Sequence, residues 1–201
     1  MKAVIRKYSL EILSVILFGV VTLTAVMPVV SIPRKILSVL MFLFVLHEWE
    51  ENVYPGGFSQ LMGRFTGVEF TPERLELAHL PVVVLLLVYL LIPYIFDSVP
   101  LLTIPIIILC IFECFVHVAG IKIHKMKRPY TPGLLTALCM LAAAIWAIRL
   151  LNEAELVRGE DYGLGAVMML VGFAIMQRTV LAINGFGYKD ILKILKSKRK
   201  R

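Results

Sequence analysis

"ILSVLMFLFVLHEWEENVYP", residues 36–55, is an apolar run of membrane-helix length that ends in a burst of charge. A helix of about 20 residues covers the roughly 30 Å hydrocarbon core of a bilayer. Four ionisable side chains, His47, Glu48, Glu50 and Glu51, nevertheless follow one another within five positions. Ionised groups are costly in lipid, and those that occur there usually have a function. This stretch therefore predicts a membrane helix with a polar site at one end.

The rest of the chain has the same long apolar runs. Of its 201 residues 59% are hydrophobic, and the mean hydropathy is +0.86. These runs are too long and too numerous for the core of a soluble domain of this size. Helices rather than strands are expected, because backbone exposed to lipid must satisfy its own hydrogen bonds. The sequence predicts an all-α, polytopic membrane helix bundle forming one domain over residues 1–201. Its six expected spans are residues 9–30, 35–54, 74–96, 99–121, 132–151 and 162–184.

The distribution of positive charge predicts how the bundle is oriented. Sixteen of the 21 Lys and Arg residues lie in the N-terminal tail, in the loops 55–74 and 122–128, and in the C-terminal tail. Only four lie at the opposite ends of the spans. By the positive-inside rule both termini are cytoplasmic, which agrees with an even number of spans. We expect a multi-pass protein of the cell (cytoplasmic) membrane.

The same reasoning sets the expected partners. A net charge of +7 would suggest nucleic acid in a soluble chain, but here topology and anionic lipid explain it, and no nucleic-acid-binding module is evident. The basic tail, residues 188–201, is expected to contact anionic lipid. Cys110, Cys114 and Cys139 lie inside apolar runs, so we expect them to be small hydrophobic side chains rather than a disulfide framework.

Three of the expected helices bring His and Glu to one membrane depth, near the cytoplasmic side. The residues are His47, Glu50 and Glu51 in the second span, Glu76 and His79 in the third, and Glu113 and His117 in the fourth. Spacings of three or four residues put the members of each group on one helix face. The Glu-x-x-His pattern on inward-facing helices is how four-helix carboxylate bundles hold two iron or manganese ions.

A divalent metal would explain these groups most simply. An ionised residue at mid-helix costs about 2.5–3.5 kcal/mol, so seven of them would together cost well over roughly 10 kcal/mol if unpaired. Arg178 is the one comparably embedded base. We therefore predict one or two divalent ions bound by these seven residues, with iron or manganese favoured because Glu outnumbers His, and zinc as the alternative. Taken singly, each residue could instead be a hydrated or hydrogen-bonded core group.

Three residues are candidates for a catalytic role. Glu48 and Glu50 could each act as a general base, and Arg178 could bind an anionic substrate head group. For Arg178 the alternative is snorkelling to the interface. The pattern His47-Glu48-x-x-Glu51 also resembles a zinc-protease helix whose second His is replaced by Glu, which would make Glu48 the base.

Residues 47–51, His-Glu-Trp-Glu-Glu, fit the pattern His-x-x-Glu-Glu. The chain resembles the bacterial membrane-protein family named after this motif (HXXEE), whose members are of similar length and apolar throughout. Residues 130–133, Tyr-Thr-Pro-Gly, stand before a Thr-Ala pair and look like a second landmark of that family. The resemblance covers most of the chain. It implies importance for His47, Glu50 and Glu51 but no reaction, because the function of the family is not characterised.

Four functions fit these patterns. The leading hypothesis is a membrane-embedded, carboxylate- and histidine-bound iron oxidoreductase that acts on a lipid-like or isoprenoid substrate in the cytoplasmic half of the bilayer. Zinc would instead suit a membrane hydrolase. A transporter of metal ions or protons is the second alternative, although the outer halves of the spans contain almost no polar residues for a path. A structural role, with the cluster joining helices by hydrogen bonds, is the third.

Overall fold

The computed structural model describes residues 2–66, 71–190 and 193, and all of its regular structure there is helical. The expected all-α class is therefore confirmed for this part of the chain, whereas most of the predicted basic tail, 188–201, lies outside it. The helices are α1 (Lys2–Lys7), α2 (Ser9–Ala25), α3 (Ile32–Asn52), α4 (Phe58–Thr66), α5 (Pro72–Ile95), η1 (Pro100–Thr103), α6 (Ile104–Ile123), α7 (Leu134–Glu153) and α8 (Gly159–Ile183).

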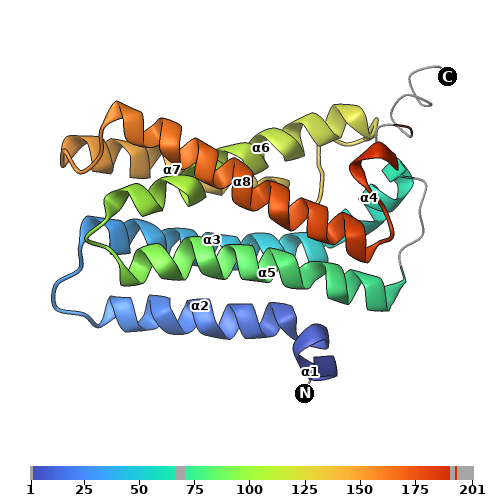
Figure 1. Cartoon of the computed structure of the whole chain (residues 1–201), viewed down its shortest axis with the longest axis horizontal. Coiled ribbons are helices and arrows are strands. Elements are labelled where there is room, and N and C mark those ends of the chain that lie inside the picture. The colour runs from blue at the N-terminus through green and yellow to red at the C-terminus, as the bar shows by residue number, and fades with distance from the viewer. Residues whose placement is uncertain (1, 67–70, 191–192, 194–201) are drawn as a thin grey trace.

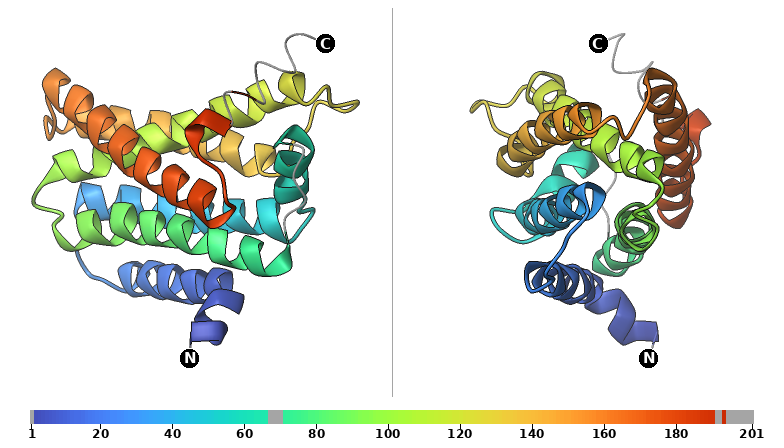
Figure 2. Two further views of the ribbon diagram at one scale, coloured as in Figure 1. Left: turned by 45° about the vertical axis from the view of Figure 1, so that its right-hand side comes forward. Right: turned by 90° about the vertical axis from the view of Figure 1, so that its left-hand side faces the viewer.

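Six long helices run back and forth between two ends of the molecule. Figure 1 shows α2, α3 and α5 lying nearly parallel, with α6, α7 and α8 crossing over them. The end-on view in Figure 2 places α3 and α5 between α2 on one side and the other three helices on the other. Helix α3 packs against α2, α5 and α7, so it lies at the centre of the bundle.

Four of the six predicted spans are helices long and apolar enough to cross a membrane: α5, residues Pro100–Ile123, α7 and α8. Helix α2 is apolar but has only 17 residues, and it ends before Pro28, whose ring cannot continue a helix. Helix α2 therefore ends five residues before the end of the predicted first span, 9–30. Helix α3 has 21 residues and would extend about 31 Å at 1.5 Å per residue, but it is charged at both ends.

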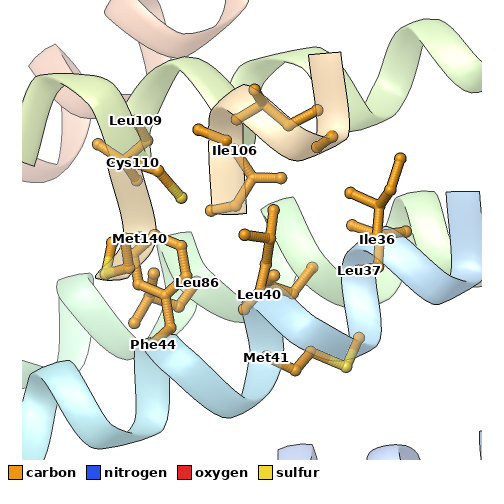
Figure 3. Close-up of a cluster of buried hydrophobic side chains, with 14 of the residues drawn as sticks. Ile36, Leu37, Leu40, Met41, Phe44, Leu86, Ile106, Leu109, Cys110 and Met140 are labelled. Atoms are coloured by element: carbon orange, nitrogen blue, oxygen red, sulfur yellow. The ribbon is translucent and has the colours of Figure 1, made fainter. Parts of the chain in front are cut away.

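The central core fixes α3 against its neighbours. Five side chains of α3 form one face at helical spacing, and each is at most 2% exposed. Figure 3 shows them meeting side chains of α5, α6 and α7. The cluster includes Ile36, Leu37, Leu40, Met41, Phe44, Leu86, Ile106, Leu109, Cys110 and Met140. In a bilayer such a core is held by close packing rather than by exclusion of water. Packing therefore also fixes the turns of α3 that follow Phe44.

The polar residues gather at one end of the bundle, on the right in Figure 1. The last turns of α3, α6 and α8 lie there, as do α1, α4 and the first turns of α5 and α7. The predicted common level of the His and Glu residues follows from this alternation of helix direction. At the opposite end an ion pair of 3.2 Å between Arg34 Nη2 and Asp97 Oδ1 joins α3 to α5.

Candidate metal centre

The last two turns of α3 carry the whole motif into the interior. His47, Glu48 and Glu50 are 2%, 5% and 7% exposed. Because a helix turns about 100° per residue, their side chains and that of Glu51 leave α3 in different directions. They therefore meet three neighbouring helices: His47 and Glu50 contact α7, Glu48 contacts α5, and Glu51 contacts α6.

Glu50 caps α7 from outside that helix. Helix α7 begins after Gly133 with no side-chain cap of its own. The Glu50 carboxylate accepts hydrogen bonds from the backbone N–H groups of Leu135 at 3.1 Å and Thr136 at 2.8 Å, and also from the Thr136 hydroxyl. The positive end of the α7 dipole favours this anion. All of this acceptor capacity is directed at α7 and the loop before it.

The Tyr130 hydroxyl supplies the fourth hydrogen bond to Glu50, at 2.8 Å. Tyr130 lies in the loop between α6 and α7. Burial raises the pKa of its phenol, and the hydrogen bond to the Glu50 carboxylate raises that pKa further. The phenol therefore stays protonated and remains a donor.

The same Thr136 hydroxyl orients His47. A hydroxyl has one hydrogen, and in Thr136 it is donated to the Glu50 carboxylate. The Thr136 oxygen, 2.9 Å from His47 Nδ1, must then accept the Nδ1–H of His47. In the neutral imidazole this leaves Nε2 of His47 deprotonated, with its lone pair directed away from α7. A histidine held by its other ring nitrogen in this way is the usual arrangement of a metal ligand.

His117 on α6 is held in a similar way by Thr131. The Thr131 hydroxyl donates to the His117 carbonyl at 3.1 Å, and its oxygen lies 3.2 Å from His117 Nδ1. The Nε2 atom of His117 is buried and has no hydrogen-bond partner among the residues that the structure describes. Orphaned buried polar atoms are rare in native proteins and call for an explanation.

Two carboxylates converge on the two imidazoles. Glu51 Oε1 lies 3.1 Å from His117 Nε2 and 3.7 Å from His47 Nε2, and Glu113 Oε2 lies 3.8 Å from His117 Nε2. Two ligands bound tetrahedrally at about 2.1 Å from one ion are about 3.4 Å apart. The observed separations lie on either side of that value. Lone pairs and carboxylate oxygens this close repel one another unless a proton or a metal cation lies between them.

The group His47, Glu113 and His117 could hold one metal ion. One ligand atom from each residue lies within 4.8 Å of the others. The rings of His47 and His117 meet edge to face, with centroids 5.1 Å apart, and Phe58 of α4 covers the His117 ring at 5.7 Å. The donor set of nitrogen and carboxylate oxygen suits first-row transition metals and zinc.

Gly133 explains how close the loop before α7 comes to these ligands. Its backbone is left-handed, with φ of +93°, and a Cβ there would lie 2.6 Å from His117 Cε1 and 2.8 Å from Glu51 Cγ. Only glycine combines this conformation with this contact. The segment 130–133 thus packs directly behind the candidate metal ligands.

Glu48 belongs to a second polar group. Its Oε2 lies 2.9 Å from His79 Nε2 on α5, while His79 Nδ1 lies 2.8 Å from the Ser9 hydroxyl on α2. Asn52, one turn further along α3, donates to the same Glu48 oxygen at 3.3 Å. Both ring nitrogens of His79 are therefore engaged, Nε2 by Glu48 and Nδ1 by Ser9. Neither is free to bind a metal ion together with the two other histidines.

Two further candidates from the sequence lie away from these groups. Glu76 Oε2 accepts from Arg6 Nε at 2.8 Å, in an ion pair about one-third exposed at each end. Arg178 is an exposed residue of α8 that lines a separate surface hollow with Lys189 and Lys193. The structure therefore brings together His47, Glu51, Glu113 and His117, and engages Glu48, Glu50, Glu76 and His79 elsewhere.

A cavity of about 440 Å³ adjoins both polar groups. It is bounded by α3, α4, α5, α6 and α8, and its lining is mainly apolar. Its polar lining includes His47, Glu48, Glu51, His79 and Glu113. A mostly apolar cavity with a few convergent polar groups is the usual form of a small-molecule site.

Sequence reasoning missed the side chains that hold the ligands in place. Thr131, Gly133 and Thr136 stood out in the sequence only as parts of a family landmark, and Ser9 did not stand out. The signal for the first three was their position in one short segment at the level of the motif. Ser9 had no signal beyond lying at the start of the first span.

Comparison with known proteins finds a family match to a stretch of the chain that contains the motif. Searches among curated proteins and among solved structures find no match to this chain. A family model described as "Protein of unknown function with HXXEE motif" matches residues 38–147, which include the motif, both histidines of the candidate centre and Thr136. The chain therefore belongs to the HXXEE family.

Proposed function

We propose that this protein is a membrane-embedded, metal-dependent enzyme that acts on a lipid-like substrate. One divalent ion would be held by His47, His117 and Glu113, with Glu51 between the two imidazoles. The observation that carries the proposal is the buried Nε2 of His117, which has no hydrogen-bond partner among the described residues and lies 3.1 Å from a carboxylate oxygen beside an apolar cavity. A cation at this point removes the unfavourable contact.

The contacts of the other acidic residues favour one ion over two. Glu50, Glu76 and Glu48 are engaged by α7, Arg6 and His79 respectively. The sequence favoured iron because Glu outnumbers His, but three of these carboxylates are engaged elsewhere and are not free to bind a metal ion. Two imidazoles with one or two carboxylates are found in iron oxygenases as well as in zinc hydrolases. Iron-dependent oxidation and zinc-dependent hydrolysis are thus both consistent with the site.

The residues around the ion have different proposed roles. A bound ion would supply Lewis-acid or redox chemistry at the polar end of the cavity. Glu48 lines the same cavity and is hydrogen-bonded to His79, so it is the group best placed to take or return a proton at its carboxylate. The apolar walls exclude water from the rest of the substrate. Thr136 and Thr131 keep the two imidazoles in the tautomer that binds a metal.

We further propose that all six long helices cross the membrane, with both termini and the candidate centre on the cytoplasmic side. The support is the alternation of helix direction and the excess of Lys and Arg at the end where the centre lies. The charges of α3 lie at its two ends, where neighbouring helices or the interface can accommodate them. Contact with anionic lipid through the tail 188–201 follows from the same orientation.

The packing of the far half of the bundle favours an enzyme over a transporter. A transport path needs polar groups through the whole thickness. Beyond the cavity, α3 instead contributes Ile36, Leu37 and Leu40 to a core where each of them is 0% exposed. A substrate would thus enter and leave the cavity on the same side of the bundle.

An isotope experiment tests the proposal and separates the two reactions. The protein, loaded with iron or with zinc, is incubated in vesicles of bacterial lipid extract, once under ¹⁸O₂ and once in H₂¹⁸O, and the lipids are analysed by mass spectrometry. The matched control is His117→Gln, which retains a polar side chain but not the imidazole.

An enzyme of the proposed kind gives a lipid product that the His117→Gln variant does not form. Label from O₂ indicates oxygenation, label from water indicates hydrolysis, and an unlabelled dehydrogenated lipid indicates desaturation. Metal flux into sealed vesicles without any lipid product would instead support the transporter and contradict the proposal.

A further inference from the structure

We propose that the cavity binds a single-chain lipid with an uncharged hydroxyl or carbonyl head group, and that the lipid enters from the side between α5 and α8. The inference relies on the metal ion of the proposed function, but the residues that line the cavity support it independently. The inference goes further than a lipid-like substrate, because it specifies the charge of the head group and the path of the chain.

The two helices are joined at two levels: by Tyr89 near the middle of α8, and by Arg74 Nη1 of α5, which donates to the Asn184 carbonyl at 3.4 Å at the end of α8. A Cβ at Gly172 of α8 would lie 2.0 Å from the Tyr89 hydroxyl of α5, so the Tyr89 side chain lies directly against the α8 backbone where Gly172 has no side chain. The same Tyr89 hydroxyl donates to the Met168 carbonyl. Between these two levels, residues of both helices line the cavity.

The walls that α5 and α8 contribute to the cavity are mainly apolar. Helix α5 contributes Ala78, Val82 and Leu86 at spacings of four, which places them on one face. Helix α8 contributes Phe173, Met176 and Val180. Gln177, which is exposed, also lines the cavity, so the cavity reaches the surface along α8. An alkyl or prenyl chain fits such a wall.

The volume limits the length of the chain. At roughly 30 Å³ for each group of water size, a cavity of about 440 Å³ holds about 15 non-hydrogen atoms. This is enough for one long chain and its head, but not for the two chains of a phospholipid. The second chain of a larger lipid would have to remain in the bilayer.

The charges of the lining select the head group. Glu48, Glu51 and Glu113 line the polar end, and no Lys or Arg lines the cavity in the described ranges. An anionic head would meet three carboxylates without a basic partner, and a cationic head would compete with the metal ion. A hydroxyl or carbonyl oxygen can approach the ion, and a hydroxyl can also donate to Glu48. Arg178 lines a different hollow and offers no alternative partner.

Photo-crosslinking of the purified full-length protein tests this inference. Three alkyl probes carry a diazirine at the same carbon of a chain of about 14 carbons, chosen to match the volume above. They differ only in the head: hydroxyl, carboxylate or trimethylammonium. Labelled peptides are identified by mass spectrometry, and the metal content of each sample is measured in parallel.

We expect the hydroxyl probe to label peptides of α5 and α8 at least fivefold more than either charged probe. Ala78→Phe, which puts a ring into the cavity, should reduce that labelling at least fivefold. Leu77→Phe is the matched control, because the neighbouring Leu77 is 38% exposed and does not line the cavity. If Ala78→Phe does not fold, Val180→Phe on α8 replaces it.

Equal labelling by the three probes, or labelling unchanged by the ring in the cavity, would overturn the inference. Its failure is distinct from that of the proposed function. Stoichiometric metal without selective labelling refutes only the lipid, whereas selective labelling without bound metal refutes only the metal-dependent enzyme.

Discussion

Replacing Glu50 by Gln tests whether this residue of the motif anchors a helix rather than binding metal. The Glu50 carboxylate accepts four hydrogen bonds, from Tyr130, Leu135 and, twice, Thr136. Gln keeps one oxygen, so the two bonds made by the other oxygen are lost and an NH₂ group faces the donors. At about 1.5–3 kcal/mol for each buried bond to a charged group, the loss is about 3–6 kcal/mol.

The matched control is Glu76→Gln. Its ion pair with Arg6 is about one-third exposed at both ends, and such pairs contribute about 0–1 kcal/mol. Thermal unfolding in detergent, followed by circular dichroism, compares the two variants. With about 2–4 °C per kcal/mol for a chain of this size, Glu50→Gln should lower Tm by about 6–24 °C and Glu76→Gln by at most about 4 °C. Two variants that unfold together would refute the anchoring role of Glu50.

Three further outcomes follow from the contacts around the ligands. Thr136→Val removes the hydroxyl that orients His47 and should weaken metal binding about 10–100-fold in equilibrium dialysis, with little change in helix content; undiminished affinity would contradict the tautomer argument. Gly133→Ala puts a Cβ 2.6 Å from the His117 ring and forces a left-handed alanine, so it should lower stability by about 1–3 kcal/mol in denaturant unfolding, and a variant as stable as wild type would count against that packing. Removing the ion with a chelator should lower the Tm of the wild type, because the free energy of unfolding falls by about 2.7 kcal/mol if the ion was present at 100 times Kd. The Tm of His117→Gln should not change. An equal response of both proteins would contradict this site.

The sequence predicted the level of the site because that level depends on helix order alone. Alternating apolar runs put the end of α3, the start of α5 and the end of α6 together, and the motif residues lie there. Helix periodicity also put His47 and Glu51 on neighbouring sides of α3, and Glu113 and His117 on one face of α6. These are local properties of each helix, so no knowledge of the packing was needed.

The partners of the individual acids could not be predicted in the same way. Glu50 meets Thr136, Glu48 meets His79, and Glu76 meets Arg6, at sequence separations of 86, 31 and 70 residues. Which carboxylate remains for a metal depends on the rotation of each helix about its axis. That rotation is set by interhelical packing, for which a uniformly apolar helix carries little periodic signal.

The central claim is tested most directly by the metal content of the purified protein. Wild-type protein and the variants His47→Gln, Glu113→Gln, His117→Gln and Glu76→Gln are dialysed against each candidate metal and analysed by elemental mass spectrometry. We predict one ion per chain for the wild type and for Glu76→Gln, and near-complete loss for the other three. Absence of a stoichiometric ion from the wild type, or full retention in the variants of both histidines, would contradict the assignment of a metal centre.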